Sequence, residues 1–482
     1  MSLVILKELE CYTANVDLPH KESDLIVQLG LADDINRYHA IVKELNNTTF
    51  LKHRKPSTRV SELTTNYSED EEEEVPKEFK GKETFQFTFV GIVVVMGVTI
   101  AIYPKHVGDI QLDKINEYRK FKQILRVIYQ YQKRQEQQII LSSDELVNQE
   151  NQLGIAIQLL NYYSEYGLYR VEKTLTELNG EGEINWFKTI NEVPIVLSGK
   201  SPVYIDPYTD RNITDEQNII RQIQLATMNS IKEEYNDILL LLDYDVPSED
   251  SVLLSDLGDG ESLFYHLDNE LRVQFISHKI ELITLLKLYI QSKTRDNEVE
   301  IISTFGVTKF DRVWEDVCKV VYGDNLEDSL KTLGLKYKKY PENTLKLKDV
   351  VPKPIWTNLI NGEEYNATKS LELDVLHVNK ASKTFEIYDG KYYLISFENN
   401  KIKGQPGVGD ITKQYLYELT FKELANENGY HITNKFIVPI DDIINDNKEI
   451  ASISLPIFDS ENLSAITVLA RECGTIFGQY LN

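Results

Sequence analysis

The stretch over residues 84–104 carries no charged side chain, and it constrains the fold more than any other part of the sequence. About 20 apolar residues are enough for a helix to span a bilayer. The core of this stretch, FVGIVVVMGVTIAIYP, is instead dominated by β-branched residues, which favour strands. Gly91 and Gly97 interrupt it, and phenylalanines alternate with polar residues at its start. We therefore predict two buried strands, roughly 85–95 and 98–103, joined by a turn near Met96-Gly97, and no contact with a membrane.

Net charge, cysteine spacing and the first residues indicate the cellular compartment and the kind of partner. There are 52 Lys plus Arg against 76 Asp plus Glu, a net charge of −24. This balance argues against a general nucleic-acid coat, although a local basic patch can still bind DNA. Cys11, Cys318 and Cys473 are too far apart in sequence for a zinc ribbon and fit a reducing compartment. The first dozen residues contain charges and no small-residue cleavage site, so we expect a cytoplasmic protein.

Length and pattern divide the chain into three predicted domains. The 482 residues suffice for two to four domains, and we expect an α+β multidomain protein. Residues 1–80 are predicted to be a helical extension that ends in the acidic run 69–74. That run is either a solvated linker or an arm for a basic partner. Residues 85–300 follow as a β-hairpin and long helices, and residues 301–482 as an α/β domain.

The segment over residues 194–201 nearly matches the phosphate-binding loop G-x-x-x-x-G-K-[ST]. Pro194 replaces the first glycine and supplies neither the permissive backbone nor an N–H donor. Pro202 also follows Ser201 directly, and a residue before proline is driven out of helical space. We therefore predict a turn between two strands at Gly199. The chain is expected to bind no nucleotide itself, so any nucleotide hydrolysis would come from a partner.

Two acidic residues and a lysine are predicted to meet in one hairpin. Asp374 lies in an apolar strand, and a polar turn leads to a second strand in which Asp389 and Lys391 share one face. Two adjacent carboxylates repel each other unless a cation lies between them, and oxygen ligands suit Mg²⁺. Lys391 would orient or deprotonate a water and stabilise a pentavalent phosphate. The alternative is an ordinary Asp-Gly-Lys hairpin turn.

Two further residues extend this candidate site. Glu315, in a helix that begins near residue 310, is predicted to be a further metal ligand; the alternatives are a solvated helix face or an ion pair with Lys319. Gln414, in a helix after the Gly/Pro loop 404–407, is predicted to contact the scissile phosphate or the attacking water. The alternative for Gln414 is an amide on the helix surface.

Local basicity near residues 331–353 suggests a DNA-backbone surface despite the acidic total. Tyrosines are interleaved with the lysines, which is typical of nucleic-acid binding. The residues expected to bind DNA are Lys336, Lys338, Lys339, Lys346, Lys348 and Lys413. The alternative is a solvated pair of strands.

These motifs together resemble the LlaJI family of restriction endonucleases, which is related to McrC, the nuclease subunit of McrBC systems. The resemblance is carried by Phe310-x-x-Val-Trp-Glu-Asp-Val-Cys, Leu373-Asp-Val-Leu-His, Phe385-x-Ile-x-Asp-Gly-Lys-Tyr-Tyr and Gly404-Gln-Pro-Gly-Val-Gly-Asp-Ile-x-Lys-Gln-Tyr. With weaker N-terminal motifs it covers roughly residues 85–440. It implies a PD-(D/E)xK nuclease core, on whose catalytic triad Asp374, Asp389 and Lys391 fall by motif. Leu373 stands where the motif has proline, a position that supplies no ligand.

The resemblance also implies a partner. Such nuclease subunits work with a separate McrB-like AAA+ GTPase hexamer, dock on it through their N-terminal part and stimulate GTP hydrolysis. The resemblance thus implies an Mg²⁺-dependent subunit that cleaves double-stranded DNA. Exposed candidates for the docking surface are Lys105, Arg119, Lys120 and Lys122, unless they only solvate a helix. The competing hypothesis is a non-catalytic adaptor that docks on and stimulates an AAA+ NTPase.

Overall fold

The structure is a computed structural model with two compact units, and we describe each by itself. Unit 1 comprises Met1–Leu146 and Thr304–Asn482, and unit 2 comprises Val147–Ser303. The described residues are 2–17, 21–48, 50–54, 79, 82–108, 114–142, 152–199, 201–242, 244, 246–247, 252–294, 302–342, 344–398 and 401–482. The acidic run 69–74 and the predicted domain boundaries at residues 80 and 300 lie outside these ranges.

The uncharged stretch forms the hairpin that the sequence predicted. Strands β5 (Val90–Val95) and β6 (Val98–Tyr103) pair antiparallel. Met96 and Gly97 make the turn, with φ of +46° and +78°. Every residue of β6 is buried, so the apolar side chains are covered by protein. No helix among the described residues is long and apolar enough to cross a membrane.

The first predicted strand is divided between two sheets. β4 (Thr84–Phe87) pairs with β3 (Leu51–Arg54) and β2 (Tyr12–Thr13), whereas β5 and β6 join β1 (Ser2–Lys7) and β12 (Ile302–Val307). A single strand over 85–95 was therefore wrong, because the chain changes sheets at residues 88–89. Gly91 permits the close approach to β12: a Cβ there would lie 2.1 Å from the carbonyl oxygen of Phe305. Helices α1 (Leu25–Gln28), α2 (Ile35–Asn47) and α3 (Lys114–Ser142) complete this half of unit 1.

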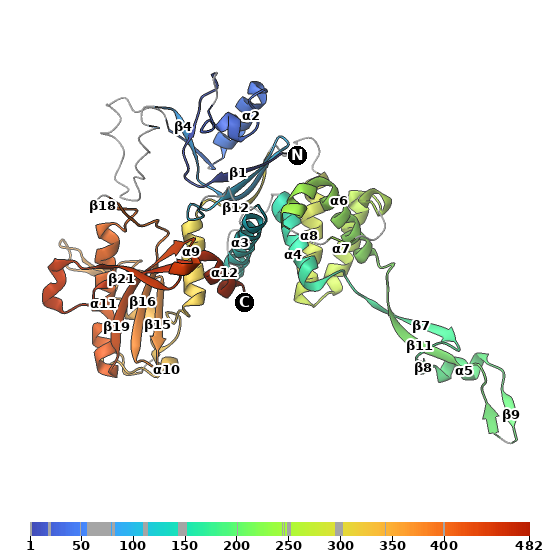
Figure 1. Ribbon diagram of the computed structural model, residues 1–482. Helices are drawn as coiled ribbons and strands as arrows, with labels where there is room; N and C mark the ends of the chain where they lie inside the picture. The colour runs from blue at the N-terminus through green and yellow to red at the C-terminus, as the bar shows by residue number, and fades with distance from the viewer. Residues whose placement is uncertain are drawn as a thin grey trace. The chain divides into compact units, whose positions relative to one another are not determined.

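Unit 2 is a group of helices from which a β-rich arm extends (Figure 1). The helices are α4 (Gln152–Tyr166), α6 (Ile219–Leu242), η3 (Leu254–Asp256), α7 (Gly260–Val273) and α8 (Ser277–Thr294). The arm contains β7 (Glu172–Leu178), β8 (Glu183–Ile184), α5 (Trp186–Glu192), β9 (Val196–Ser198), β10 (Ser201–Val203) and β11 (Tyr208–Thr214). β9 and β10 are antiparallel, which confirms the two strands predicted on either side of Gly199.

The C-terminal half of unit 1 is built on one mixed sheet, in the order β15-β16-β19-β21-β20. β15 (Val375–Asn379) and β16 (Thr384–Gly390) form an antiparallel hairpin. β19 (His431–Ile440) runs parallel to β16 and to β21 (Ile466–Glu472), and β20 (Lys448–Ile453) pairs antiparallel with β21. The predicted mixed α+β fold is therefore confirmed.

Helices flank this sheet at the end of β16 (Figure 1). Phe385 and Ile387 pack with side chains of α11 (Val408–Asn428), whereas Tyr388 contacts Tyr322 just after α9 (Phe310–Val321). Because strand side chains alternate between faces, the two helices cover opposite faces of β16. α12 (Cys473–Leu481) packs beside α9.

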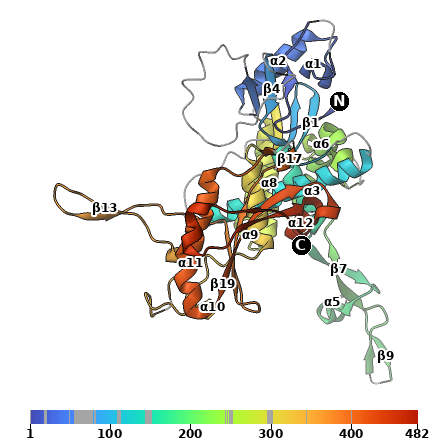
Figure 2. The ribbon, with the colours of Figure 1, turned by 60° about the vertical axis from the view of Figure 1, so that its left-hand side comes forward.

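The remaining elements are short. They are α10 (Leu330–Leu333), η4 (Leu347–Val350), β13 (Ile355–Thr357), β14 (Glu364–Asn366), β17 (Ser396–Glu398), β18 (Lys401–Lys403), η5 (Ile443–Asn445) and η6 (Pro456–Glu461). β13 and β14 pair as a hairpin that projects away from the sheet, as Figure 2 shows. The chain continues from this hairpin to Asp374, which immediately precedes β15.

A candidate active site at the end of β16

Asp374 and Asp389 lie side by side at the open end of the β15–β16 hairpin. The register pairs Val375 with Tyr388, which places the preceding Asp374 opposite Asp389. An oxygen of Asp374 accepts a hydrogen bond from the backbone N–H of Gly390 at 3.1 Å. The side chain of Asp389 is 10% exposed. Two residues 15 positions apart thus form one half-enclosed carboxylate pair, as the hairpin pattern predicted.

Lys391, the residue directly after β16, lies beside this pair. Its Nζ lies 3.3 Å from a carboxylate oxygen of Asp389 and 3.3 Å from one of Asp410. The backbone N–H of Lys391 donates to the carbonyl of Ile437 at 2.8 Å, which keeps the residue beside β19. The lysine is therefore held between two carboxylates.

Burial and like charges dominate the electrostatics of the site. Burial raises the pKa of Asp374 well above its usual range, and the neighbouring Asp389 and Glu315 raise it further against the opposing effect of Lys391. Burial alone would lower the pKa of Lys391, but Asp389, Asp410 and Asp374 together raise it above its ordinary value. The site has more acidic groups than its lysine offsets, so an added positive charge would be favourable there.

Glu315 reaches the neighbourhood because residue 390 is a glycine. A Cβ on Gly390 would lie 3.2 Å from the Cα of Glu315 and 3.3 Å from the Sγ of Cys318, so α9 packs directly on the strand. Burial, followed by the charges of Asp311 and Asp389, raises the pKa of Glu315 to about 7, although the positive charge of Lys391 acts to lower it. Lys319 contacts Asp324 at 3.6 Å, so the alternative of a Glu315–Lys319 ion pair is wrong.

The oxygen donors at the end of β16 suit a hard divalent cation. Among the described residues, no three His, Cys, Asp or Glu side chains gather closely enough to hold a metal ion by themselves. Asp374 and Asp389 nevertheless form an adjacent pair of oxygen donors whose mutual repulsion a cation would relieve. Glu315 lies near enough to influence both electrostatically. The residues fit Mg²⁺ as two protein ligands completed by water or substrate, which is how Mg²⁺ is commonly bound.

Gln414 is completely buried on α11, at 0% exposure. The alternative of a helix-surface amide is therefore wrong. Neither its side-chain nitrogen nor its oxygen has a hydrogen-bond partner, and Asn434 donates to its backbone carbonyl at 2.9 Å. Its contact with a phosphate or a water stays a prediction.

Asp410 is the site residue that the sequence reasoning missed. It lies in the first turn of α11, where one carboxylate oxygen contacts Lys391 and the other accepts a hydrogen bond from the Tyr393 hydroxyl at 3.3 Å. The available signal was its spacing of one helical turn from Gln414, which places the two side chains on one face of the helix. The residue anchors the segment 391–393 to α11.

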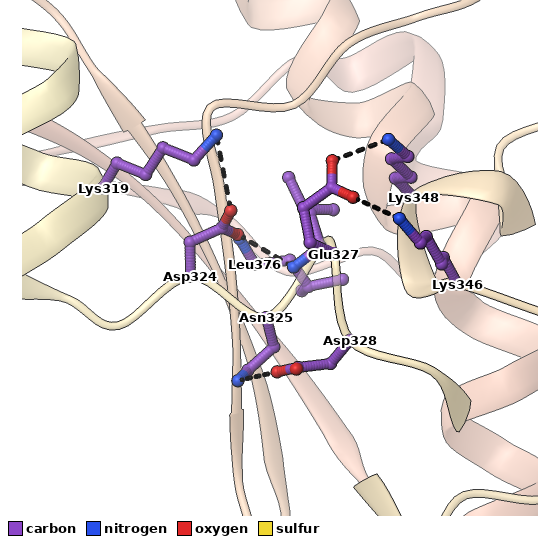
Figure 3. Close-up of polar contacts among 9 residues, drawn as sticks. Lys319, Asp324, Asn325, Glu327, Asp328, Lys346, Lys348 and Leu376 are labelled. Carbon is purple, nitrogen blue, oxygen red and sulfur yellow. Dashed lines mark hydrogen bonds and ion pairs between the residues drawn. The ribbon is translucent and has the colours of Figure 1, made fainter. Parts of the chain in front are cut away.

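The lysines predicted to bind DNA are largely engaged with acidic groups. Figure 3 shows Glu327 between Lys346 and Lys348, with ion pairs of 2.8 and 2.6 Å. Hydrogen bonds from these lysines lower the pKa of Glu327 to about 2. Lys339 pairs with Glu423, and Lys338 lies 4.0 Å from Glu427. Lys336 and Lys413 are exposed. DNA binding at these residues stays a prediction, with much of the positive charge already offset.

The residues predicted for partner docking differ in their exposure. Arg119 is exposed and Lys122 half-buried, and Lys120 pairs with Asp441 at 2.9 Å. Lys105 is only 7% exposed, so the prediction that it lies on the surface was wrong. The chain turns inward after β6, and the ammonium of Lys105 lies over the ring of Tyr392, 4.8 Å from its centroid.

The chain is similar to proteins of restriction systems. The sequence model described as LlaJI restriction endonuclease matches residues 89–470. The chain is 28% identical over 406 residues to the type II restriction enzyme BsuMI component YdjA of Bacillus subtilis strain 168, covering 82% of this chain and 80% of that protein.

Two solved assemblies from Thermococcus gammatolerans show weaker likeness. A chain of the half-complex of McrB AAA+ hexamers with bound McrC has 13% identity and a TM-score of 0.35, covering 100% of this chain and 98% of that chain. A chain of the McrBC complex has 14% identity and a TM-score of 0.23, covering 66% and 86%. Both TM-scores are low, so the fold and the site are described from the geometry of this chain alone.

Proposed function

The chain belongs to the LlaJI restriction endonuclease family, and from this premise we propose that it is the DNA-cleaving component of a restriction system. The reaction is hydrolysis of phosphodiester bonds in double-stranded DNA. The observation that carries this proposal is the cluster at the end of β16. Asp374 and Asp389 are adjacent there, and the Nζ of Lys391 lies 3.3 Å from Asp389. This set supports a PD-(D/E)xK nuclease centre.

In this proposal Asp374 and Asp389 hold Mg²⁺, and Glu315 is a further candidate ligand. Bound Mg²⁺ would polarise the scissile phosphate and lower the pKa of a water. Lys391 lies beside Asp389 and carries its positive charge, since the neighbouring carboxylates raise its pKa. We therefore assign Lys391 to orienting the attacking water and offsetting the charge that develops on the phosphate, rather than to accepting a proton.

The partner proposal has two supports. The relative from Bacillus subtilis is named a component of its restriction enzyme, which indicates an assembly of several chains. The arm of unit 2 also exposes large apolar side chains, with Phe187 at 83% and Leu197 at 71% exposure. Trp186 and Ile190 of α5 are exposed as well, and monomeric proteins rarely expose several large apolar side chains together, so this arm suits a protein partner. From the sequence resemblance we propose a McrB-like AAA+ GTPase as that partner.

The test is DNA cleavage by the assembled complex in Mg²⁺. Asp389→Ala should abolish cleavage while leaving folding and partner binding intact, because its loss relieves the repulsion with Asp374 and leaves Lys391 paired with Asp410. Cleavage by the Asp389→Ala complex at the wild-type rate would contradict the assignment. If wild type stimulates a GTPase but cuts no DNA, the adaptor hypothesis takes its place.

A further inference from the structure

A buried carboxylate from the extreme N-terminal segment lies behind the candidate active site. Strand β1 runs parallel to β6 in unit 1, and Glu8 follows it directly. The backbone N–H of Glu8 donates to the carbonyl of Tyr103 at 2.8 Å, which extends that pairing by one residue. The side chain points inward, and Glu8 is only 8% exposed. Burying a carboxylate is costly unless it is hydrogen-bonded, so its partners indicate its role.

The main partner of Glu8 is Tyr392, the neighbour of Lys391. The Tyr392 hydroxyl donates to Glu8 at 2.7 Å, across 384 positions of sequence. The backbone N–H of Lys105 lies 3.2 Å from the same carboxylate oxygen and 3.0 Å from the Tyr392 oxygen. The ring of Tyr392 also packs against Phe310, the first residue of α9, with centroids 5.3 Å apart. Tyr392 is thus fixed from the N-terminal sheet and from the helix that carries Glu315.

Tyr392 is also the middle residue of a tight turn. The backbone N–H of Tyr393 donates to the carbonyl of Lys391 at 2.9 Å. The side chains of Lys391 and Tyr393 both reach Asp410. The segment 391–393 is therefore held on one side by α11 and on the other by Glu8. Loss of either anchor would free the backbone that sets the position of the Lys391 ammonium.

We infer that Glu8 is a positioning residue of the nuclease centre, which acts through Tyr392 to hold Lys391 in place. The inference rests on the proposed function and deepens it. The family match begins at residue 89, so this role belongs to a segment outside the matched region. It makes the first strand of the chain a part of the active-site support.

The test compares three variants in the full complex, measuring cleavage at saturating DNA, the KM for DNA and the thermal midpoint. Tyr392→Phe removes one hydroxyl and should lower kcat roughly 10- to 100-fold, because small displacements of a reacting group have effects of this size. The KM and the thermal midpoint should change little. Glu8→Ala should have a similar effect on kcat, and Glu8→Gln, which keeps an acceptor for the hydroxyl, should restore most of it.

The matched control is Tyr12→Phe. Tyr12 is also a buried tyrosine in this part of unit 1, and its hydroxyl donates to Glu10 at 3.0 Å and accepts from the backbone N–H of Lys7. Its loss should leave kcat unchanged. Because Glu8 acts through Tyr392, the double variant Glu8→Ala/Tyr392→Phe should be no slower than Tyr392→Phe alone.

Three results would overturn the inference. They are wild-type cleavage by Tyr392→Phe, additive losses in the double variant, or an equal loss in Tyr12→Phe. A wild-type complex that does not cut DNA would instead contradict the proposed function, so the two failures are distinguishable. If Glu8→Ala fails to fold, Tyr392→Phe still decides the matter, because it removes the same hydrogen bond from the tyrosine side and preserves nearly all of the packing.

Discussion

Unit 1 contains two clusters of charged side chains, in which the pKa values of the carboxylates are shifted in opposite directions. At the end of β16 the acidic groups outnumber the base and are enclosed, and burial and mutual repulsion raise the pKa of Asp374 and of Glu315. Around Glu327 two lysines meet one exposed carboxylate, and its pKa is lowered to about 2. The second cluster is electrostatically satisfied by itself, whereas the first would gain from a cation. This difference separates a candidate reaction centre from an ordinary surface ion pair.

The largest expected effect compares a lysine from each cluster. Lys391→Ala should lower the cleavage rate at least ~100-fold, because the variant loses the charge next to the reacting phosphate. Lys346→Ala should leave kcat nearly unchanged and weaken DNA binding slightly. The slope of the logarithm of DNA affinity against the logarithm of salt concentration should fall by about one. Cleavage kinetics and DNA-binding titrations at several salt concentrations measure both. Equal losses of kcat in the two variants would remove the distinction between the clusters.

A smaller effect is expected for Asp410→Asn. The amide still accepts the hydrogen bond from Tyr393 but no longer attracts the Lys391 ammonium electrostatically. We expect kcat to fall about 10-fold, since a mispositioned group loses part of its contribution. DNA affinity and Mg²⁺ affinity should not change. A fall in Mg²⁺ affinity, measured by calorimetry, would instead make Asp410 a metal ligand.

Divalent cations should stabilise the first cluster and not the second. A cation at 100 times its dissociation constant adds about 2.7 kcal/mol to the stability of the state that binds it. Ca²⁺ or Mg²⁺ should therefore raise the thermal midpoint of the wild-type chain. Asp374→Asn/Asp389→Asn should lose this response, and Glu327→Gln should keep it. A response that survives in the double variant would place the cation elsewhere.

The pH dependence of stability should differ in sign between the two clusters. Glu315 has a folded-state pKa of about 7 against an ordinary value of 4.5, so the folded state binds its proton more tightly. Its contribution to stability is fully present below pH 4.5 and is lost as the pH rises through 7. Glu327, with its lowered pKa, contributes above pH 4.5 and loses that contribution as the pH falls through 2. The second effect is small because the pair is exposed.

Metal-free denaturation curves over this pH range check the prediction. Glu315→Gln should flatten the decline between pH 4.5 and 7, because the amide does not titrate. Added Mg²⁺ should flatten it as well, since a cation favours the ionised carboxylates. An unchanged slope in Glu315→Gln would assign the decline to other groups.

Local sequence patterns were sufficient where the interacting segments are neighbours in the chain. The β5–β6 hairpin follows from β-branched residues on both sides of Met96-Gly97. The Asp374–Asp389 pair follows from two strands and one turn, because a register then places their ends together. Both features depend on short separations and on the two-residue period of strands.

The features that the sequence did not reveal depend on contacts between distant segments. Lys105 follows an apolar strand and is charged, as surface residues usually are. Its backbone N–H nevertheless lies within hydrogen-bond distance of Glu8 and Tyr392. Glu8 and Tyr392 are 384 positions apart, and no local period relates them. Asp410 contacts Lys391 only because α11 covers the face of β16 that bears Asp389. These positions follow from tertiary packing, which one sequence does not specify by pattern alone.

The central claim is that the carboxylate pair at the end of β16 is the nuclease centre. The most direct measurement is the rate of double-stranded DNA cleavage in Mg²⁺ by complexes that contain wild type, Asp374→Asn or Glu327→Gln. The substitutions are matched, since each replaces one carboxylate by its amide in one of the two clusters. We predict that wild type and Glu327→Gln cut at the same rate and that Asp374→Asn does not cut. Cleavage by Asp374→Asn at the wild-type rate would contradict the account.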